Sequence, residues 1–199
     1  MPTKSLLLTL FLLIPIEGLP NREYTSNGLP SNPHESSITW TGCIRENDDP
    51  ISLTGLSLQH IEAQIREMNP DFSWSRAIKP RPGNSFTESD VLCDISWNPS
   101  FASVFHIRQG ISYLHKIHGE CTNGPGPGNC SRVSCSYHSG IWFCNDNPHP
   151  MSVPCSTFGD RAWDIIQKCY SFGDFPDDSV HGQIFDTDGW NVIVAGAHC

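Results

Sequence analysis

The sequence predicts an α+β fold in which an antiparallel sheet carries two helices packed on one of its faces, with disulfides stabilising the domain. Three observations lead to this prediction. Helical and strand patterns follow one another in the second half of the 199-residue chain as helix, hairpin, helix and hairpin. The chain contains nine cysteines, and its first residues have the pattern of a secretory signal. An exported domain with many cysteines typically forms disulfides.

The N-terminal segment predicts secretion. Lys4 precedes a short apolar run over residues 6–16, and the small residue Gly18 follows. About 20 apolar residues are needed to cross a bilayer, so this run is too short for a membrane anchor. We expect a signal peptide over residues 1–18, a flexible leader over residues 19–37, and a secreted, extracellular protein with no membrane anchor.

The composition narrows the classes of partner. The formal net charge is −9, and the 12 basic residues are scattered along the chain. An acidic surface offers no long-range attraction to nucleic acid or to an anionic membrane. We therefore expect neither as a partner. Nine cysteines cannot all pair within one chain, so at least one is free or pairs between chains.

An extension over residues 38–100 precedes the main domain, which we place at residues 101–199. Within the extension, apolar side chains recur at helical spacing over residues 57–68, and Pro70 follows to end the helix. The apolar residues of this stripe are Leu58, Ile61, Ile65 and Met68.

The main domain begins with a helix from about Val104, for which Gly119 provides a C-terminal cap. Its apolar stripe consists of Val104, Ile107, Ile111 and Leu114. A loop rich in Gly and Pro then joins Cys121 to Cys130. A hairpin follows, because apolar and polar residues alternate on both sides of a turn near His138-Ser139.

A further helix and a second hairpin complete the predicted fold. Apolar residues at helical spacing predict a helix over residues 158–169, and Thr157 with Asp160 resembles a capping box. The segments VHGQIF and WNVIVA then flank residues 186–189, whose Asp-Gly pair favours a tight turn.

Neither a metal nor a cofactor is predicted. The spacing of Cys130, Cys135 and Cys144 lacks the close cysteine pair of a structural zinc site, and an exported thiol tends to oxidise. His115 and His118 lie three residues apart on a helix, but no third ligand accompanies them in a recognisable motif.

The catalytic alternatives are weaker than a binding role. A nucleophilic thiol needs a base, but His138 near Cys135 falls at the predicted hairpin tip, where a solvated residue is expected. Asp146 and Asp186 lie in or beside turns, where Asp is commonly structural. We predict a protein that is not an enzyme. The alternative is a secreted hydrolase that uses such acids on cell-wall polysaccharide.

Strand alternation predicts one disulfide and one interaction face. Cys130 and Cys144 fall on the same face of the first hairpin and are expected to pair. The Cys135 side chain is expected to point toward the core. Arg132, Ser134 and Trp142 are expected to point outward, as a candidate interaction face. The alternative is that the extension covers Trp142.

Six segments follow one another over residues 104–199, namely IRQGISYLHKI, GPGPGNC, CSRVSC, GIWFCND, FGDRAWDIIQKC and GQIF…WNVIV, with Cys199 at the close. In order and in cysteine placement they resemble the fungal killer toxins of the KP-four type and the related Ecp-two effector domain. This resemblance implies a secreted, disulfide-tied α/β sandwich without a cofactor. It also implies a role in antagonism of competing fungi or in host cell death and virulence.

The resemblance also implies two disulfides, Cys121–Cys199 and Cys43–Cys169. The sequence does not decide the pairing of Cys93, Cys135 and Cys155, one of which should be odd. Outside the resemblance, SITWTGC could add an edge strand carrying Cys43.

The chain departs from the killer toxins in its charge. Killer toxins are basic and use a strand lysine, whereas this chain is acidic and its nearest basic residue is Arg132. We therefore expect a monomeric, secreted, non-enzymatic effector or toxin-like protein that binds an extracellular or host protein.

Overall fold

The computed structural model describes residues 36–45, 48–74, 91–95, 100–172 and 178–199. The predicted signal peptide lies outside the described residues, as does the predicted leader except for its last two positions.

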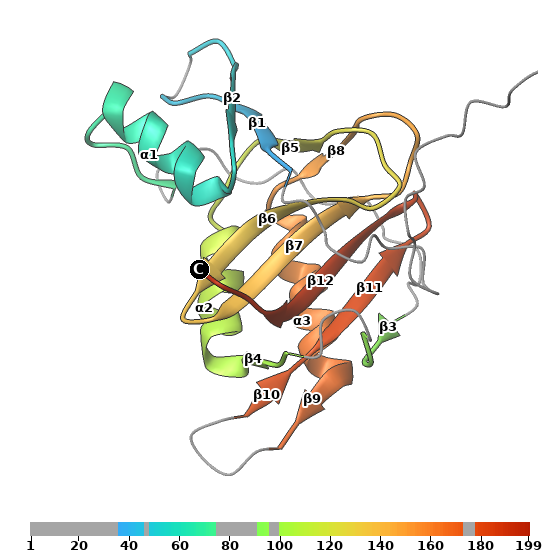
Figure 1. Cartoon of the computed structure of the whole chain (residues 1–199). Helices are drawn as coiled ribbons and strands as arrows, with labels where there is room; N and C mark the ends of the chain where they lie inside the picture. Colours follow the sequence, from blue (N-terminus) through green and yellow to red (C-terminus); the bar gives the residue numbers. More distant parts are fainter. Residues whose placement is uncertain (1–35, 46–47, 75–90, 96–99, 173–177) are drawn as a thin grey trace, which may run out of the picture.

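A five-stranded antiparallel sheet forms the centre of the molecule (Figure 1), and its strand order is β3-β11-β12-β7-β6. The strands are β3 (Val91–Leu92), β6 (Asn129–Ser136), β7 (Ser139–Asn145), β11 (Gly182–Asp186) and β12 (Trp190–Gly196). Helices α2 (Val104–Leu114) and α3 (Thr157–Cys169) lie beside one another on one face of this sheet. The predicted fold class is therefore confirmed.

The core lies between the sheet and these two helices. Phe143 of β7 stacks on Phe158 of α3 with ring centroids 4.7 Å apart, and Trp190 of β12 meets both rings edge-on. The apolar stripe predicted for α2 is buried along its length. Burial of one such side chain contributes about 1.5–3 kcal/mol, so this interface supplies much of the driving force for folding.

A four-stranded antiparallel sheet, in the order β2-β1-β5-β8, joins the extension to the main domain. Its strands are β1 (Ile38–Gly42), β2 (Ile51–Gly55), β5 (Glu120–Asn123) and β8 (Met151–Pro154). The strand predicted from SITWTGC is β1, but it is not an edge strand, because β2 pairs with its other side.

Helix α1 (Leu58–Met68) packs beside β2 and matches the predicted helix. The Ser57 hydroxyl accepts a hydrogen bond from the backbone N–H of His60 at 3.3 Å and so caps the first turn. A small three-stranded sheet is formed by β4 (Ala102–Ser103), β10 (Ser179–Val180) and β9 (Tyr170–Ser171).

The hairpin β6–β7 contains two features that the sequence pattern did not predict. Tyr137 and His138 have φ values of 45° and 58°, so they form the two-residue turn, one position earlier than predicted. The register then shifts between Arg132 and Ser134, which marks a β-bulge at Val133. Without this shift the hairpin register would place Cys144 opposite Ser131. With it, Cys144 lies opposite Cys130.

Four disulfides cross-link the described chain, and Cys43 is a free cysteine. The pairs are Cys93–Cys169, Cys121–Cys155, Cys130–Cys144 and Cys135–Cys199. The prediction of Cys130–Cys144 from strand alternation is confirmed.

The two pairings implied by the resemblance, Cys121–Cys199 and Cys43–Cys169, are wrong. Cys121 lies opposite Val153 in the β5–β8 pair, which brings it beside Cys155. The pairing of β3 with β11 brings Cys93 to the end of α3, where Cys169 lies.

The odd cysteine is Cys43 and not Cys93, Cys135 or Cys155. The bulge at Val133 also turns Cys135 away from the core, contrary to the prediction. Cys135 lies opposite Gly140 and pairs with Cys199.

Candidate functional site

The three residues of the predicted interaction face do not form a free surface. Trp142 is only 7% exposed and packs in an apolar cluster with Ile95, Ile193 and the Cys130–Cys144 disulfide. Because Ile95 belongs to residues 38–100, the alternative that the extension covers Trp142 is confirmed, and the predicted exposure of Trp142 is wrong.

Ser134 and Arg132 are also engaged within the fold. Ser134 is buried, and the bulge turns it toward α2, where a Cβ added at Gly110 would lie 2.8 Å from the Ser134 hydroxyl oxygen. The outward direction predicted for Ser134 is therefore wrong. Arg132 is half-buried, and its Nη1 donates to the backbone carbonyl of His198 at 2.7 Å.

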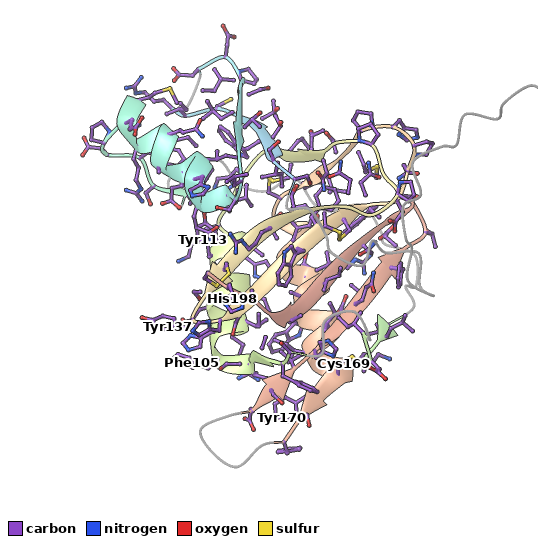
Figure 2. The ribbon with its side chains drawn as sticks, viewed as in Figure 1. Phe105, Tyr113, Tyr137, Cys169, Tyr170 and His198 are labelled. Carbon is purple, nitrogen blue, oxygen red and sulfur yellow. A yellow bond between two sulfur atoms is a disulfide. The ribbon has the colours of Figure 1, made fainter. Side chains whose placement is uncertain are left out.

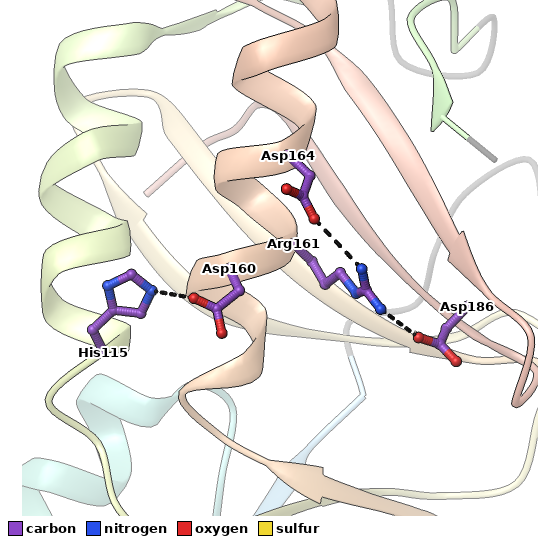
Figure 3. Close-up of polar contacts among 5 residues, drawn as sticks. All are labelled: His115, Asp160, Arg161, Asp164 and Asp186. Carbon is purple, nitrogen blue, oxygen red and sulfur yellow. Dashed lines mark hydrogen bonds and ion pairs between the residues drawn. The ribbon is translucent and has the colours of Figure 1, made fainter. Parts of the chain in front are cut away.

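The carboxylates of the hydrolase alternative both have partners within the fold. Asp146 Oδ1 accepts from the Gly128 backbone N–H at 2.9 Å, and its Oδ2 accepts from Asn191 Nδ2 at 2.7 Å. Asp186 forms a buried ion pair with Arg161 at 2.8 Å (Figure 3). Asp186 also accepts from the Asp188 backbone N–H, so each carboxylate holds a turn in place.

The two histidines that were considered as metal ligands, His115 and His118, contact different partners. His115 Nε2 meets Asp160 Oδ1 at 3.0 Å between α2 and α3 (Figure 3), whereas His118 Nε2 donates to the Trp74 carbonyl oxygen at 2.7 Å. Among the described residues, no group of three or more His, Cys, Asp or Glu side chains is placed to hold a metal ion.

Exposed aromatic side chains gather where the start of α2 meets the tip of the β6–β7 hairpin. Phe105 is 63% exposed and Tyr137 is 74% exposed. The His106 ring stacks on Tyr137 at 4.5 Å with an interplanar angle of 18°, and it meets Phe105 edge-on at 5.1 Å. Figure 2 shows Phe105 and Tyr137 near one another at this end of the molecule. We call Phe105, His106 and Tyr137 the aromatic cluster.

An open groove of about 610 Å³ continues from the aromatic cluster along the outward side of α2. We call it the α2 groove, and it is lined by Phe105, Arg108, Gln109, Ser112, Tyr113 and Lys116. These positions recur at helical spacing on the side of α2 opposite its buried stripe. The groove is therefore bounded by the rigid backbone of α2 and by long, mostly polar side chains that can change conformation.

Arg108 and Tyr113, two residues of the groove lining, have defined surroundings. The Arg108 guanidinium lies over the Trp163 ring of α3, 5.5 Å from its centroid. This contact holds the cation in place while leaving its hydrogen-bond donors available. Burial, together with the nearby Glu62 carboxylate, raises the pKa of Tyr113 well above its usual value. Tyr113 therefore stays protonated and neutral at any physiological pH.

The aromatic cluster was not predicted, although one of its residues has a signal in the sequence. Phe105 falls one position away from the buried stripe of α2, so a large apolar side chain occupies a position that should face solvent. The approach of Tyr137 to the same place could not be predicted, because it depends on where the hairpin tip meets the helix.

Comparison with known proteins identified no relative of this chain. No protein-family model, no curated protein and no solved structure matches this chain. Among the described residues, no helix combines the length and the apolar character needed to cross a membrane.

Proposed function

We propose that this chain is a secreted, non-enzymatic, effector-like or toxin-like protein that acts by binding an extracellular or host protein. The observation that carries the proposal is the aromatic cluster beside the α2 groove. Large aromatic side chains held in solvent cost free energy, and they are enriched where interfaces concentrate their binding energy. The cluster joins two elements of a disulfide-tied scaffold, so it is held rigid before binding.

Three further features support the proposal. The segment over residues 1–18 has the pattern of a signal peptide. Four disulfides are typical of proteins that work in an oxidising compartment. The resemblance of residues 104–199 to killer toxins and Ecp-two effectors suggests antagonism of other fungi or modulation of host cell death.

The test compares biological activity with the aromatic cluster intact and removed. The full chain would be secreted from a eukaryotic host and applied in parallel to plant tissue and to fungal cultures. We expect cell death or growth arrest in one of the two. Phe105→Ala with Tyr137→Ala should weaken that activity about 30-fold or more, because loss of hot-spot contacts costs about 2 kcal/mol or more.

A matched control removes two exposed apolar side chains elsewhere. Leu56 and Met68 are 51% and 48% exposed and lie outside the groove, so Leu56→Ala with Met68→Ala should keep full activity. Full activity in the Phe105→Ala, Tyr137→Ala variant would refute the proposal. Turnover of a cell-wall polysaccharide that Asp146→Asn abolishes would establish the hydrolase alternative instead.

A further inference from the structure

The charge of the α2 groove is opposite to that of the whole chain. The chain carries a formal charge of −9, but the charged residues that line the groove are Arg108 and Lys116, and no acid is among the lining residues. Both cations are exposed. A cationic strip on an acidic protein does not follow from composition, so it indicates a ligand of complementary charge.

Two other cations of the described chain are engaged within the fold. Arg66 pairs with Glu62 at 2.7 Å, and Arg161 is buried against Asp164 and Asp186. In contrast, neither Arg108 nor Lys116 forms an ion pair in the described part of the chain.

Two acids near the groove already have partners. Glu62 accepts from Arg66 and, through its second oxygen, from Trp74 Nε1 at 2.9 Å. Asp160 is paired with His115. Arg108 and Lys116 are therefore the charged residues of the groove lining, and neither is neutralised by an ion pair among the described residues.

The spacing of the two cations fits an extended peptide. They lie eight residues apart along α2 and its last turn, which corresponds to roughly 12 Å along the helix axis. In an extended peptide, side chains four residues apart point to the same side and are separated by about 13 Å. Two carboxylates at this spacing can reach Arg108 and Lys116 together. Between them lie the polar side chains of Gln109 and Ser112, and Phe105 offers an apolar contact beyond Arg108.

We propose that the α2 groove binds an extended acidic peptide segment of a partner protein. Its two carboxylates, four residues apart, pair with Arg108 and Lys116, and an apolar side chain two residues before the first acid packs on Phe105. This inference rests on the proposed function, because it names the chemistry of the partner at the same site.

The test uses a defined peptide and the full, disulfide-bonded chain. The probe is an acetylated nine-residue peptide with Phe as its second residue, Glu as its fourth and eighth, and Gly and Ser elsewhere. Its matched control carries Gln in place of both Glu residues. Titration calorimetry and amide chemical-shift mapping should show that the Glu peptide binds at α2 and the Gln peptide binds about tenfold more weakly. Raising the salt concentration to roughly 0.5 M should weaken binding of the Glu peptide but not binding of the Gln peptide.

Charge-reversed variants locate the interaction. Arg108→Glu with Lys116→Glu should weaken binding of the Glu peptide about tenfold or more, and Arg108→Gln with Lys116→Gln should weaken it less. Lys168→Glu on α3 is the matched control, since Lys168 is exposed and lies outside the groove. This variant should bind within about twofold of the wild type.

Several outcomes would overturn the inference. Equal binding of the Glu and Gln peptides, no binding of the Glu peptide, or an equal loss in the Lys168→Glu variant would each contradict it. Tighter binding of an oligogalacturonate than of the Glu peptide would assign the groove to an anionic polysaccharide. If Arg108→Glu with Lys116→Glu keeps full biological activity while Phe105→Ala with Tyr137→Ala loses it, the acidic ligand is refuted and the proposed function stands.

Discussion

The two faces of the five-stranded sheet are stabilised in different ways. On the helix-covered face, Phe143, Val192 and Val194 belong to the large core that α2 and α3 complete. On the opposite face, Trp142 and Ile193 belong to a much smaller apolar cluster.

That smaller cluster is reinforced by covalent and polar links. The Cys130–Cys144 disulfide lies within it. Beside it, Gln183 Nε2 donates to Asn191 Oδ1 at 3.0 Å, and Asn191 Nδ2 donates to Asp146. The comparison teaches that neighbouring residues of one strand can depend on different forces. The helix face combines a large buried core with two disulfides, whose Cys121, Cys155 and Cys169 lie in that core. The opposite face has only a thin apolar layer around Cys130–Cys144.

The largest expected effect comes from emptying the helix face. Phe143→Ala removes a fully buried ring that stacks on Phe158, and it should lower the free energy of unfolding by about 3–5 kcal/mol. Urea denaturation should show a lower midpoint with an unchanged m-value, because the unfolded state keeps all four disulfides. A loss below about 1 kcal/mol would contradict the role assigned to this face.

A smaller effect, with a different signature, is expected from the disulfide on the opposite face. Cys130→Ala with Cys144→Ala opens a cross-link between residues 14 apart, which should cost about 3 kcal/mol. The m-value should rise, because the unfolded chain loses a constraint and exposes more surface. Cys43→Ala is the control, since Cys43 is free, and it should leave both midpoint and m-value unchanged. An unchanged m-value in the double variant would mean that the disulfide acts only through packing.

The smallest expected effect comes from overfilling the thin cluster. A Cβ added at Gly140 would lie 2.5 Å from the Trp142 ring, so Gly140→Ala should force the ring to move and cost about 1–3 kcal/mol. Near-ultraviolet circular dichroism should change in the tryptophan region while the far-ultraviolet signal is preserved. Unchanged tryptophan bands would show that the ring is free to move, against its burial in a packed cluster.

Much of the fold could be predicted from local sequence. Helices α1 and α3 lie within one residue of where their apolar periodicity placed them, and α2 begins at Val104 as predicted, because a 3.6-residue period is a local property. The predicted caps were wrong: α2 ends at Leu114 with His115 as its C-cap and not at Gly119, and the N-cap of α3 is Ser156, with no side-chain capping hydrogen bond. The second hairpin was also predicted, because its turn residues and flanking strand segments are local features too. Gly189 has a φ of 77°, a conformation that glycine adopts without strain and that the Asp-Gly pair indicated.

The candidate site was only partly accessible from sequence. The helical pattern of α2 fixed which side chains face outward, including Phe105 and Arg108. It could not show that Tyr137 and Trp163 come to the same surface, because these residues belong to elements that meet α2 only after packing.

The tertiary structure alone decided the first hairpin and most of the cysteine pairing. One inserted residue, the bulge at Val133, reverses the side-chain alternation from Ser134 onward, because side chains in a strand alternate with a period of two. Ser134 therefore turns to α2 and Cys135 turns to Cys199. Strand alternation could predict Cys130–Cys144, whose partners share one hairpin. The other three disulfides join residues 34 to 76 positions apart, and such pairs are fixed by which strands and helices lie side by side.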